Sequence, residues 1–327
     1  MLGRVTVGML AFLVAVGTAT AAEPNYPSKV IRIVTAMPGS ANDVGARFIA
    51  QGLTNTLGQR AIVDNRVGYL GIETVARAAP DGYTFLFFGN GVIWYSQFFN
   101  TEVSWDPEKD FLPVTLAIRS PNVLAVHPSL PVKSVRDLIA LAKARPGELN
   151  YASGQGGGES HLAMELFKAM TKTDIARISY KGTGQSISAL MSGEVQLILA
   201  NAGSVMPHAN SGRLHALAVA STEPSVLTPG LPTLSASVPG YESGVIIGLW
   251  APARTPAGIV SLINREAVRA LNRPETKKIF FDSGIEVVGS SPEEFAAILK
   301  SEFAKWSKVI KALDTAGRKD TASRTGR

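Results

Sequence analysis

The 327-residue sequence contains no cysteine. It therefore has no disulfide, no thiol nucleophile and no lipid-modified cysteine, which excludes thiol enzymes, disulfide scaffolds and lipoproteins. Histidine is also scarce, with four residues, and these do not cluster with Asp and Glu at the spacing of metal ligands. We therefore expect neither a metal nor another cofactor.

Long apolar runs are equally scarce. Beyond residue 22, no stretch approaches the roughly 20 apolar residues that a membrane-spanning helix requires. Residues 1–22 are typical of a signal peptide, because Arg4 gives a basic start, residues 5–16 are apolar, and small residues precede a cleavage site near Ala22. We expect an exported protein that is stable without disulfides.

The formal net charge of +6 is dispersed along the chain. Nucleic-acid-binding proteins usually carry a clustered basic stripe with interleaved aromatics, and this sequence has none. We therefore expect no nucleic-acid partner. The basic end of the chain, residues 314–327, is predicted to be a flexible, solvated tail.

Short apolar segments alternate with segments of helical periodicity, which favours an α/β fold with mostly parallel strands. A mature chain of about 305 residues suits two domains. The predicted strands are 30–34, 85–88, 123–126, 149–152, 175–179, 195–200, 214–220 and 285–288, and the predicted helices are 43–57, 70–79, 134–145, 159–172, 183–192, 204–211, 256–272 and 291–311.

Residues 30–57 form the unit around which the chain is organised: a β-branched strand, a loop of small residues and a helix. Ser40, Asn42 and Asp43 can cap this helix by accepting hydrogen bonds from its first-turn N–H groups. A helix N-terminus carries about half a positive charge and several free N–H donors. The loop therefore suits an anionic ligand.

The same order of strand, small-residue loop and helix recurs at 152–161 and 201–204. Ligands of open α/β sheets bind at the carboxyl ends of strands, so we expect the three loops to converge on one cleft. The glycine run 154–158 lacks the Lys-Ser/Thr of a P-loop, and Glu159 replaces the third glycine of a dinucleotide fingerprint. We favour a backbone cradle for a small polar ligand over a simple flexible turn.

Several side chains near these loops have more than one interpretation. His161 can orient the glycine loop, contact a ligand or act in catalysis, and Asp43 can cap its helix or act as a general base. Tyr69 can narrow a cleft or cover the sheet edge. The aromatic residues Trp94, Tyr95, Phe98 and Phe99 form either a core-facing stripe or a pocket wall. An exported α/β enzyme using His161 with a loop serine or Asp43 is therefore an alternative function, although no G-x-S-x-G elbow is present.

Short motifs, in order along nearly all of the mature chain, resemble the substrate-binding proteins of tripartite tricarboxylate transporters, the TctC or Bug-type receptors. They include Pro38-Gly39 with Asp43, Asp64-Asn65-Arg66, Pro80-Asp81-Gly82-Tyr83, Trp105-Asp106-Pro107, His161-Leu162-Ala163, Tyr180-Lys181-Gly182 and Pro239-Gly240-Tyr241.

This resemblance implies a two-lobed, type II periplasmic-binding-protein-like fold. Lobe 1 would contain residues 23–123 and 240–313, lobe 2 would contain 124–239, and crossing segments near 122–126 and 221–247 would form the hinge. It implies a monomeric periplasmic receptor, not an enzyme, that binds a small carboxylate-bearing ligand and delivers it to membrane permease subunits. A receptor for a membrane sensor is a further alternative.

In such receptors, strand-to-helix loops of both lobes hold the ligand carboxylate through backbone N–H groups and small hydroxyls. Three features depart from the family pattern. Residues 40–42 stand where glycines are usual, and the stretch between Arg66 and Ala79 is shorter, with Tyr69 and Leu70 in place of small residues. Glu159, which we expect to point to solvent, adds a negative charge. The expected ligand-binding residues are Ser40, Ala41, Asn42, Asp43, Tyr69, Asn90, Ser153, Gln155, Gly156, Gly157, His161, Asn201 and Ser204.

Overall fold

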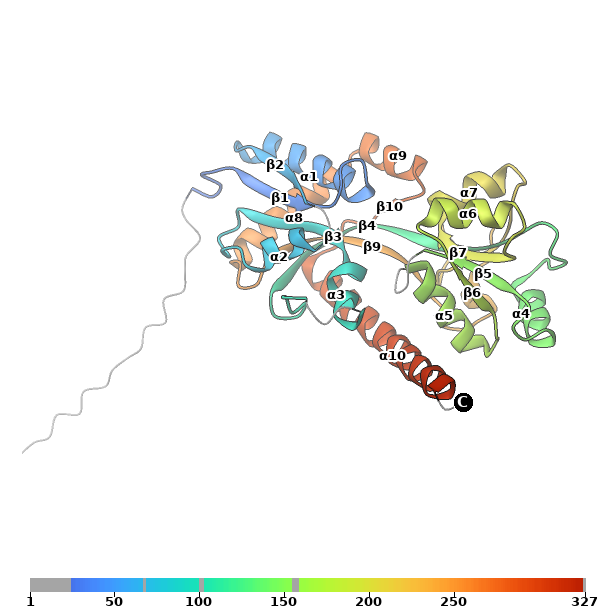
Figure 1. The fold of residues 1–327 in the computed structure, drawn as a ribbon. Helices are drawn as coiled ribbons and strands as arrows, with labels where there is room; N and C mark the ends of the chain where they lie inside the picture. Colours follow the sequence, from blue (N-terminus) through green and yellow to red (C-terminus); the bar gives the residue numbers. More distant parts are fainter. Residues whose placement is uncertain (1–24, 67–68, 100–102, 155–158, 326–327) are drawn as a thin grey trace, which may run out of the picture.

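The computed structural model describes residues 25–66, 69–99, 103–154 and 159–325, with side chains up to Lys308 apart from residues 95–99. Ten strands in this part of the chain form one continuous sheet. Its order is β2-β1-β3-β9-β4-β7-β5-β6, and β10 and β8 also pair with β4. The chain folds into two α/β lobes joined through this sheet (Figure 1).

In lobe 1, β1 pairs in parallel with β2 and β3, while β9 runs antiparallel between β3 and β4. Helices cover both faces, since α1 and α8 pack on one side and α2, α3 and α10 on the other. The elements are β1 (Ile31–Thr35), α1 (Ala41–Leu57), β2 (Ala61–Asn65), α2 (Leu70–Ala76), β3 (Thr84–Gly89), α3 (Asn90–Phe99), β9 (Gly244–Pro252), α8 (Ala257–Leu271), α9 (Pro274–Asp282), β10 (Glu286–Val287) and α10 (Pro292–Thr325).

In lobe 2, β5 pairs in parallel with β6 and β7, whereas β7 and β8 run antiparallel to β4. Helices α4 and α5 cover one face, and α6 and α7 cover the other. The elements are α4 (Val135–Ala144), β5 (Asn150–Ser153), α5 (Glu159–Thr171), β6 (Ala176–Ser179), α6 (Thr183–Met191), β7 (Leu197–Asn201), α7 (Ala202–Asn210), β8 (His215–Val219) and a 3-10 turn (Leu234–Ala236).

Strand β4 (Phe111–Val126) belongs to both lobes. It pairs with β9 as far as Pro121 and with β7 from Asn122 onward. The chain returns to lobe 1 through β9, so β4 and β9 are the crossing segments. The exact limits of the two lobes stay as predicted from the sequence.

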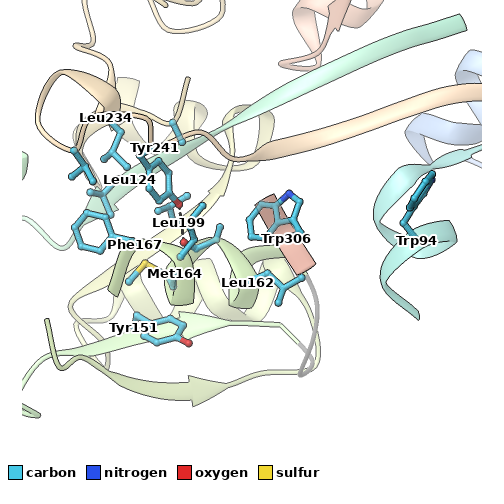
Figure 2. Close-up of a cluster of buried hydrophobic side chains, with 14 of the residues drawn as sticks. Trp94, Leu124, Tyr151, Leu162, Met164, Phe167, Leu199, Leu234, Tyr241 and Trp306 are labelled. Atoms are coloured by element: carbon cyan, nitrogen blue, oxygen red, sulfur yellow. Dashed lines mark hydrogen bonds between the residues drawn. The ribbon is translucent and has the colours of Figure 1, made fainter. Parts of the chain in front are cut away.

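The longest helix, α10, extends into residues 314–327, which the sequence analysis assigned to a flexible tail. The backbone is helical to Thr325, and the segment contains no proline that would interrupt the helix. Earlier along α10, the ring of Phe303 lies 4.9 Å from that of Trp94 in lobe 1. Trp306 packs beside Leu162 of α5 in lobe 2 (Figure 2). Helix α10 therefore contacts both lobes.

A buried aromatic cluster joins α5 to the segment that precedes β9. Tyr241 is fully buried, and its ring lies 6.2 Å from that of Phe167 (Figure 2). Its hydroxyl donates to the Ala163 carbonyl at 2.7 Å, so the polar end of this side chain is satisfied inside the core. This contact fixes the start of α5 against the crossing strands.

Candidate functional site

The β1–α1 loop is held by the carboxylate of Asp43. This side chain is 3% exposed and accepts hydrogen bonds from the Gly39 N–H at 2.9 Å, Arg47 Nε at 3.0 Å and Asn65 Nδ2 at 2.8 Å. Burial raises the Asp43 pKa, but these hydrogen bonds and the Arg47 charge outweigh it and hold the pKa at about 2. Asp43 is therefore ionised and fully engaged at neutral pH, which suits a loop support better than a general base.

The residues just before Asp43 form the start of α1. Ser40 is the N-cap, and its hydroxyl accepts the Asp43 N–H at 3.3 Å. Ala41 begins the helix, and Asn42 has a buried Oδ1 with no hydrogen-bond partner among the described residues. The α1 N-terminus thus presents small side chains and free N–H groups.

In lobe 2, the corresponding support is Arg177 of β6. Its Nε donates to Ser153 Oγ at 2.7 Å, and its guanidinium also donates to the Gly154 carbonyl at 2.9 Å. Arg177 is not among the residues predicted from the sequence, although a single basic residue within a short predicted strand was the available signal. Burial and the nearby Arg177 charge lower the pKa of His161 to about 4, so its imidazole is neutral at pH 7. His161 thus lies near Arg177, the side chain that holds the loop between β5 and α5.

The third loop joins β7 to α7. Asn201 caps α7, and its Oδ1 accepts the Ser204 N–H at 3.0 Å. The neighbouring Gly203 touches the turn between α9 and β10 in lobe 1, since a Cβ on Gly203 would lie 2.3 Å from the Ser283 carbonyl oxygen. The start of α7 therefore lies where the two lobes meet.

Two cavities adjoin at Asn201, and we call them together the interlobe cleft. The first has a volume of about 300 Å³ and lies between the lobes, and the second, of about 320 Å³, lies among the lobe 2 loops. The first is lined by Ala41, Ile118, Arg119, Ser120, Asn201, Gly203, Ser204, Val245, Ile247, Ser283 and Ile285. The second is lined by Gly154, Glu159, Ser160, Lys181, Gly182, Thr183, Ala200 and Asn201.

Several helices begin at this cleft. Ala41 starts α1, Asn201 caps α7, Glu159 starts α5 and Thr183 starts α6. Their N-termini supply partial positive charge and N–H donors from both lobes. The arrangement suits a small anionic ligand.

Glu159 corrects one expectation from the sequence. It does not point to solvent: its Oε1 is buried and has no hydrogen-bond partner within the described part of the chain. Burial raises the Glu159 pKa to about 7, opposed by a hydrogen bond from Asn122. The reason is tertiary, because Asn122 of β4 lies beside the first residue of α5.

The other predicted site residues lie at differing distances from the cleft. Tyr69 is 38% exposed and packs its ring against Trp105 at 5.3 Å, whereas Asn90 is buried at the end of β3. Neither lines the two cavities. Gln155, Gly156 and Gly157 lie outside the described residues, and ligand contact by any member of the predicted set stays a prediction.

Within the described ranges, no three His, Asp or Glu side chains gather as metal ligands would. In the same ranges, no helix combines the length and apolar character needed to cross a membrane.

Comparison with known proteins identifies the family. Residues 45–315 match the model of the tripartite tricarboxylate transporter family receptor, TctC. The chain is 32% identical over 292 residues to protein BugT of Bordetella pertussis, covering 88% of this chain and 90% of BugT.

Solved structures agree with this assignment. R. palustris Rpa4515 with adipate has a TM-score of 0.71 and 35% identity, covering 88% of this chain and 97% of that chain. MatC (Rpa3494) from Rhodopseudomonas palustris with bound malate has a TM-score of 0.69 and 28% identity, covering 87% of this chain and 100% of that chain. These findings confirm the resemblance and the two-lobed fold expected from the sequence. The chain belongs to the TctC family of tripartite tricarboxylate transporter receptors.

Proposed function

We propose that this protein is a periplasmic solute receptor that binds a small carboxylate-bearing metabolite in the interlobe cleft and delivers it to the permease subunits of a tripartite tricarboxylate-type transporter. The observation that carries this proposal is that the N-termini of α1 and α7, from different lobes, line one cavity. Relatives solved with adipate and malate support a carboxylate as the ligand class.

The lining chemistry favours recognition by backbone groups. Arg119 lines the first cavity, but its Nε donates to Glu286 at 2.8 Å, so its charge is already paired. Ala41 and Ser204 are small, which allows a ligand carboxylate to approach the helix N–H groups closely. Nothing in this arrangement requires a nucleophile or a general base, so the proposed function is binding without chemistry.

Lobe closure is the proposed mechanism. The lobes are linked by β4 and β9, and small changes of backbone angles there would bring the α1 and α7 N-termini onto the ligand. Asp43 and Arg177 would keep the two loops in shape while the lobes move.

The mature protein, from residue 23 onward, is the material for the test. Dicarboxylates, hydroxy acids, amino acids and nicotinate-like aromatics would be screened for a rise in melting temperature and a smaller scattering radius. A bound ligand at 100 times its Kd raises the unfolding free energy by about 2.7 kcal/mol, which a melting curve resolves.

A charge variant tests the anion site itself. Asn201→Asp keeps a good N-cap for α7, because Asp and Asn cap equally well, but it places a negative charge at the cleft. Carboxylate affinity should fall at least roughly tenfold while the fold is kept. Asn210→Asp, exposed at the other end of α7, is the matched control. Equal carboxylate affinity in both variants would contradict the proposed site.

A further inference from the structure

Two buried side-chain oxygen atoms, one in β4 and one at the start of α5, have no hydrogen-bond partner in the part of the chain that the structure describes. Asn122 of β4 is fully buried, and its Nδ2 donates to Ser243 Oγ at 3.2 Å, but its Oδ1 has no hydrogen-bond partner among the described residues. Glu159 Oε1 is likewise buried without a partner there. The two side chains are neighbours, since the Asn122 side chain lowers the pKa of the Glu159 carboxyl.

Among the described residues, no hydrogen bond reaches either atom. The nearby Tyr241 hydroxyl already donates to the Ala163 carbonyl at 2.7 Å and lies 3.1 Å from Ser243 Oγ. Buried acceptors are nearly always hydrogen-bonded in folded proteins, because leaving one unpaired forfeits its hydration. Glu159 lines the second cavity beside Asn201, which places this residue in the wall of the cleft.

We propose that Glu159 is a specificity-determining residue: the ligand group that binds beside it donates a hydrogen bond, as a hydroxyl, an amide or an ammonium group does, and is not a second bare carboxylate. This inference rests on the proposed receptor function and narrows its ligand class. A carboxylate at the other end of the same ligand would bind at the α1 and α7 N-termini.

The charge state of Glu159 further separates ligand groups that donate a hydrogen bond from a ligand carboxylate. Its pKa of about 7 leaves it partly ionised near neutral pH. The groups that face it are Asn122 from β4 and Tyr241 from the segment before β9, and Lys181 from the β6–α6 turn lines the same cavity. An ionised Glu159 repels a ligand carboxylate, whereas a protonated Glu159 can donate to one. A dicarboxylate should therefore bind together with a proton.

The experiment compares ligands of matched length by calorimetric titration of the mature protein. The probes are succinate against 4-hydroxybutanoate, 4-aminobutanoate and succinamate, and adipate against 6-hydroxyhexanoate, 6-aminohexanoate and adipamate. At about pH 8, one unit above the Glu159 pKa, the best donor-bearing probe should bind at least roughly tenfold tighter than its dicarboxylate. From about pH 8 to about pH 6, dicarboxylate affinity should rise by up to roughly tenfold, and hydroxyl-ligand affinity should not.

The Glu159→Gln variant removes the charge but keeps the shape. It should bind dicarboxylates more tightly than wild type at about pH 8 and lose the pH dependence. Glu148→Gln, exposed before β5 at the end of the strand away from the cleft, is the matched control and should behave as wild type.

Three outcomes would overturn the inference. Equal binding of dicarboxylate and donor-bearing probes at both pH values, or a Glu159→Gln variant with unchanged preference, would show that Glu159 does not select the ligand. Binding of these probes would still leave the receptor function standing. If no probe binds wild type at all, the receptor proposal fails and this inference fails with it. The pH series on wild type alone decides the question if the variant does not fold.

Discussion

Gly203 and Gly284 lie backbone against backbone across the two lobes. A Cβ built on Gly284 would lie 2.3 Å from the Gly203 Cα, and one built on Gly203 would lie 2.3 Å from the carbonyl oxygen of Ser283. Figure 1 shows the two elements involved, α7 of lobe 2 and α9 of lobe 1, side by side above the crossing strands. Only glycine at both positions permits this approach.

Gly203→Ala is therefore expected to push the lobes apart. The backbone of Gly203 is not in the left-handed region, so the added methyl acts by contact alone. Overpacking of this kind costs about 1–3 kcal/mol, which corresponds to a roughly 5- to 150-fold loss of ligand affinity if the contact forms on closure. Ligand titration measures the affinity, and small-angle scattering with ligand measures how far the lobes close. Gly258→Ala, in the first turn of α8 with nothing within 4 Å of the added atom, should leave both unchanged. A Gly203→Ala variant that closes normally would show that the contact does not limit closure.

Asp43→Asn is expected to destabilise the protein by about 2 kcal/mol at pH 7. The variant loses a carboxylate that accepts three hydrogen bonds, two of them from the side chains of Arg47 and Asn65. Denaturant unfolding measures the change. Asp282→Asn is the control, because Asp282 is 56% exposed and pairs with Lys278 at the surface, where such pairs contribute about 0–1 kcal/mol.

The same carboxylate gives a pH signature. The pKa of Asp43 in the folded protein, about 2, is below its unfolded value of about 3.9. Its contribution is therefore present above about pH 4 and is lost as the pH falls toward 2. The stability difference between wild type and Asp43→Asn should stay constant above about pH 5 and shrink below about pH 4. A difference that persists unchanged to pH 2 would mean that the charge of Asp43 is unimportant.

Arg177→Met is expected to loosen the β5–α5 loop and weaken ligand binding with little change in melting temperature. The variant loses the hydrogen bonds to Ser153 Oγ and to the Gly154 carbonyl but keeps most of the side-chain volume. It also removes a positive charge that lowers the His161 pKa, so that pKa should rise although burial still holds it below its ordinary value. An NMR titration of His161 reads this directly. Arg213→Met, after α7, is the control and should leave the His161 pKa unchanged.

Trp306→Ala is expected to cost about 3–5 kcal/mol, the usual range for removing a large buried ring. Trp306 is 4% exposed and packs beside Leu162, so its loss frees α10 from lobe 2 (Figure 2). Faster hydrogen exchange at the start of α5 would accompany the lower melting temperature. Lys300→Ala, on the exposed side of α10, should change stability by less than about 0.5 kcal/mol. Unchanged exchange in α5 would show that the helix does not tie the lobes together.

Local patterns predicted the strand-loop-helix units well. The unit β1–α1 appears with Ser40 as the N-cap, and Asn201 caps α7 where the sequence expected the third loop. Such units depend on neighbours within a few residues, so capping residues and apolar spacing are enough to identify them. The crossing strands β4 and β9 were harder to predict from the sequence. The first half of β4 contains Pro113 and is bulged there, and its partner β9 is distant in sequence.

The surroundings of individual side chains near the cleft were the hardest feature to predict from the sequence. The burial of Glu159 depends on Asn122 of β4 and on Tyr241 of the segment before β9, which are distant in sequence from α5. Arg177 acts on a loop from the neighbouring strand, and a single sequence contains no measure of that proximity. Predicting the loops was therefore possible, and predicting what holds each of them was not.

The shared strand β4 has one more consequence, for how the molecule unfolds. Its first part pairs with β9 and its last part with β7 and β8, so loss of either lobe exposes unpaired strand edges in the other. Independent melting of the halves would leave those peptide groups without partners, which is unfavourable. Differential scanning calorimetry of the unliganded protein should accordingly record a single endotherm, with equal van't Hoff and calorimetric enthalpies, although the architecture is bilobal.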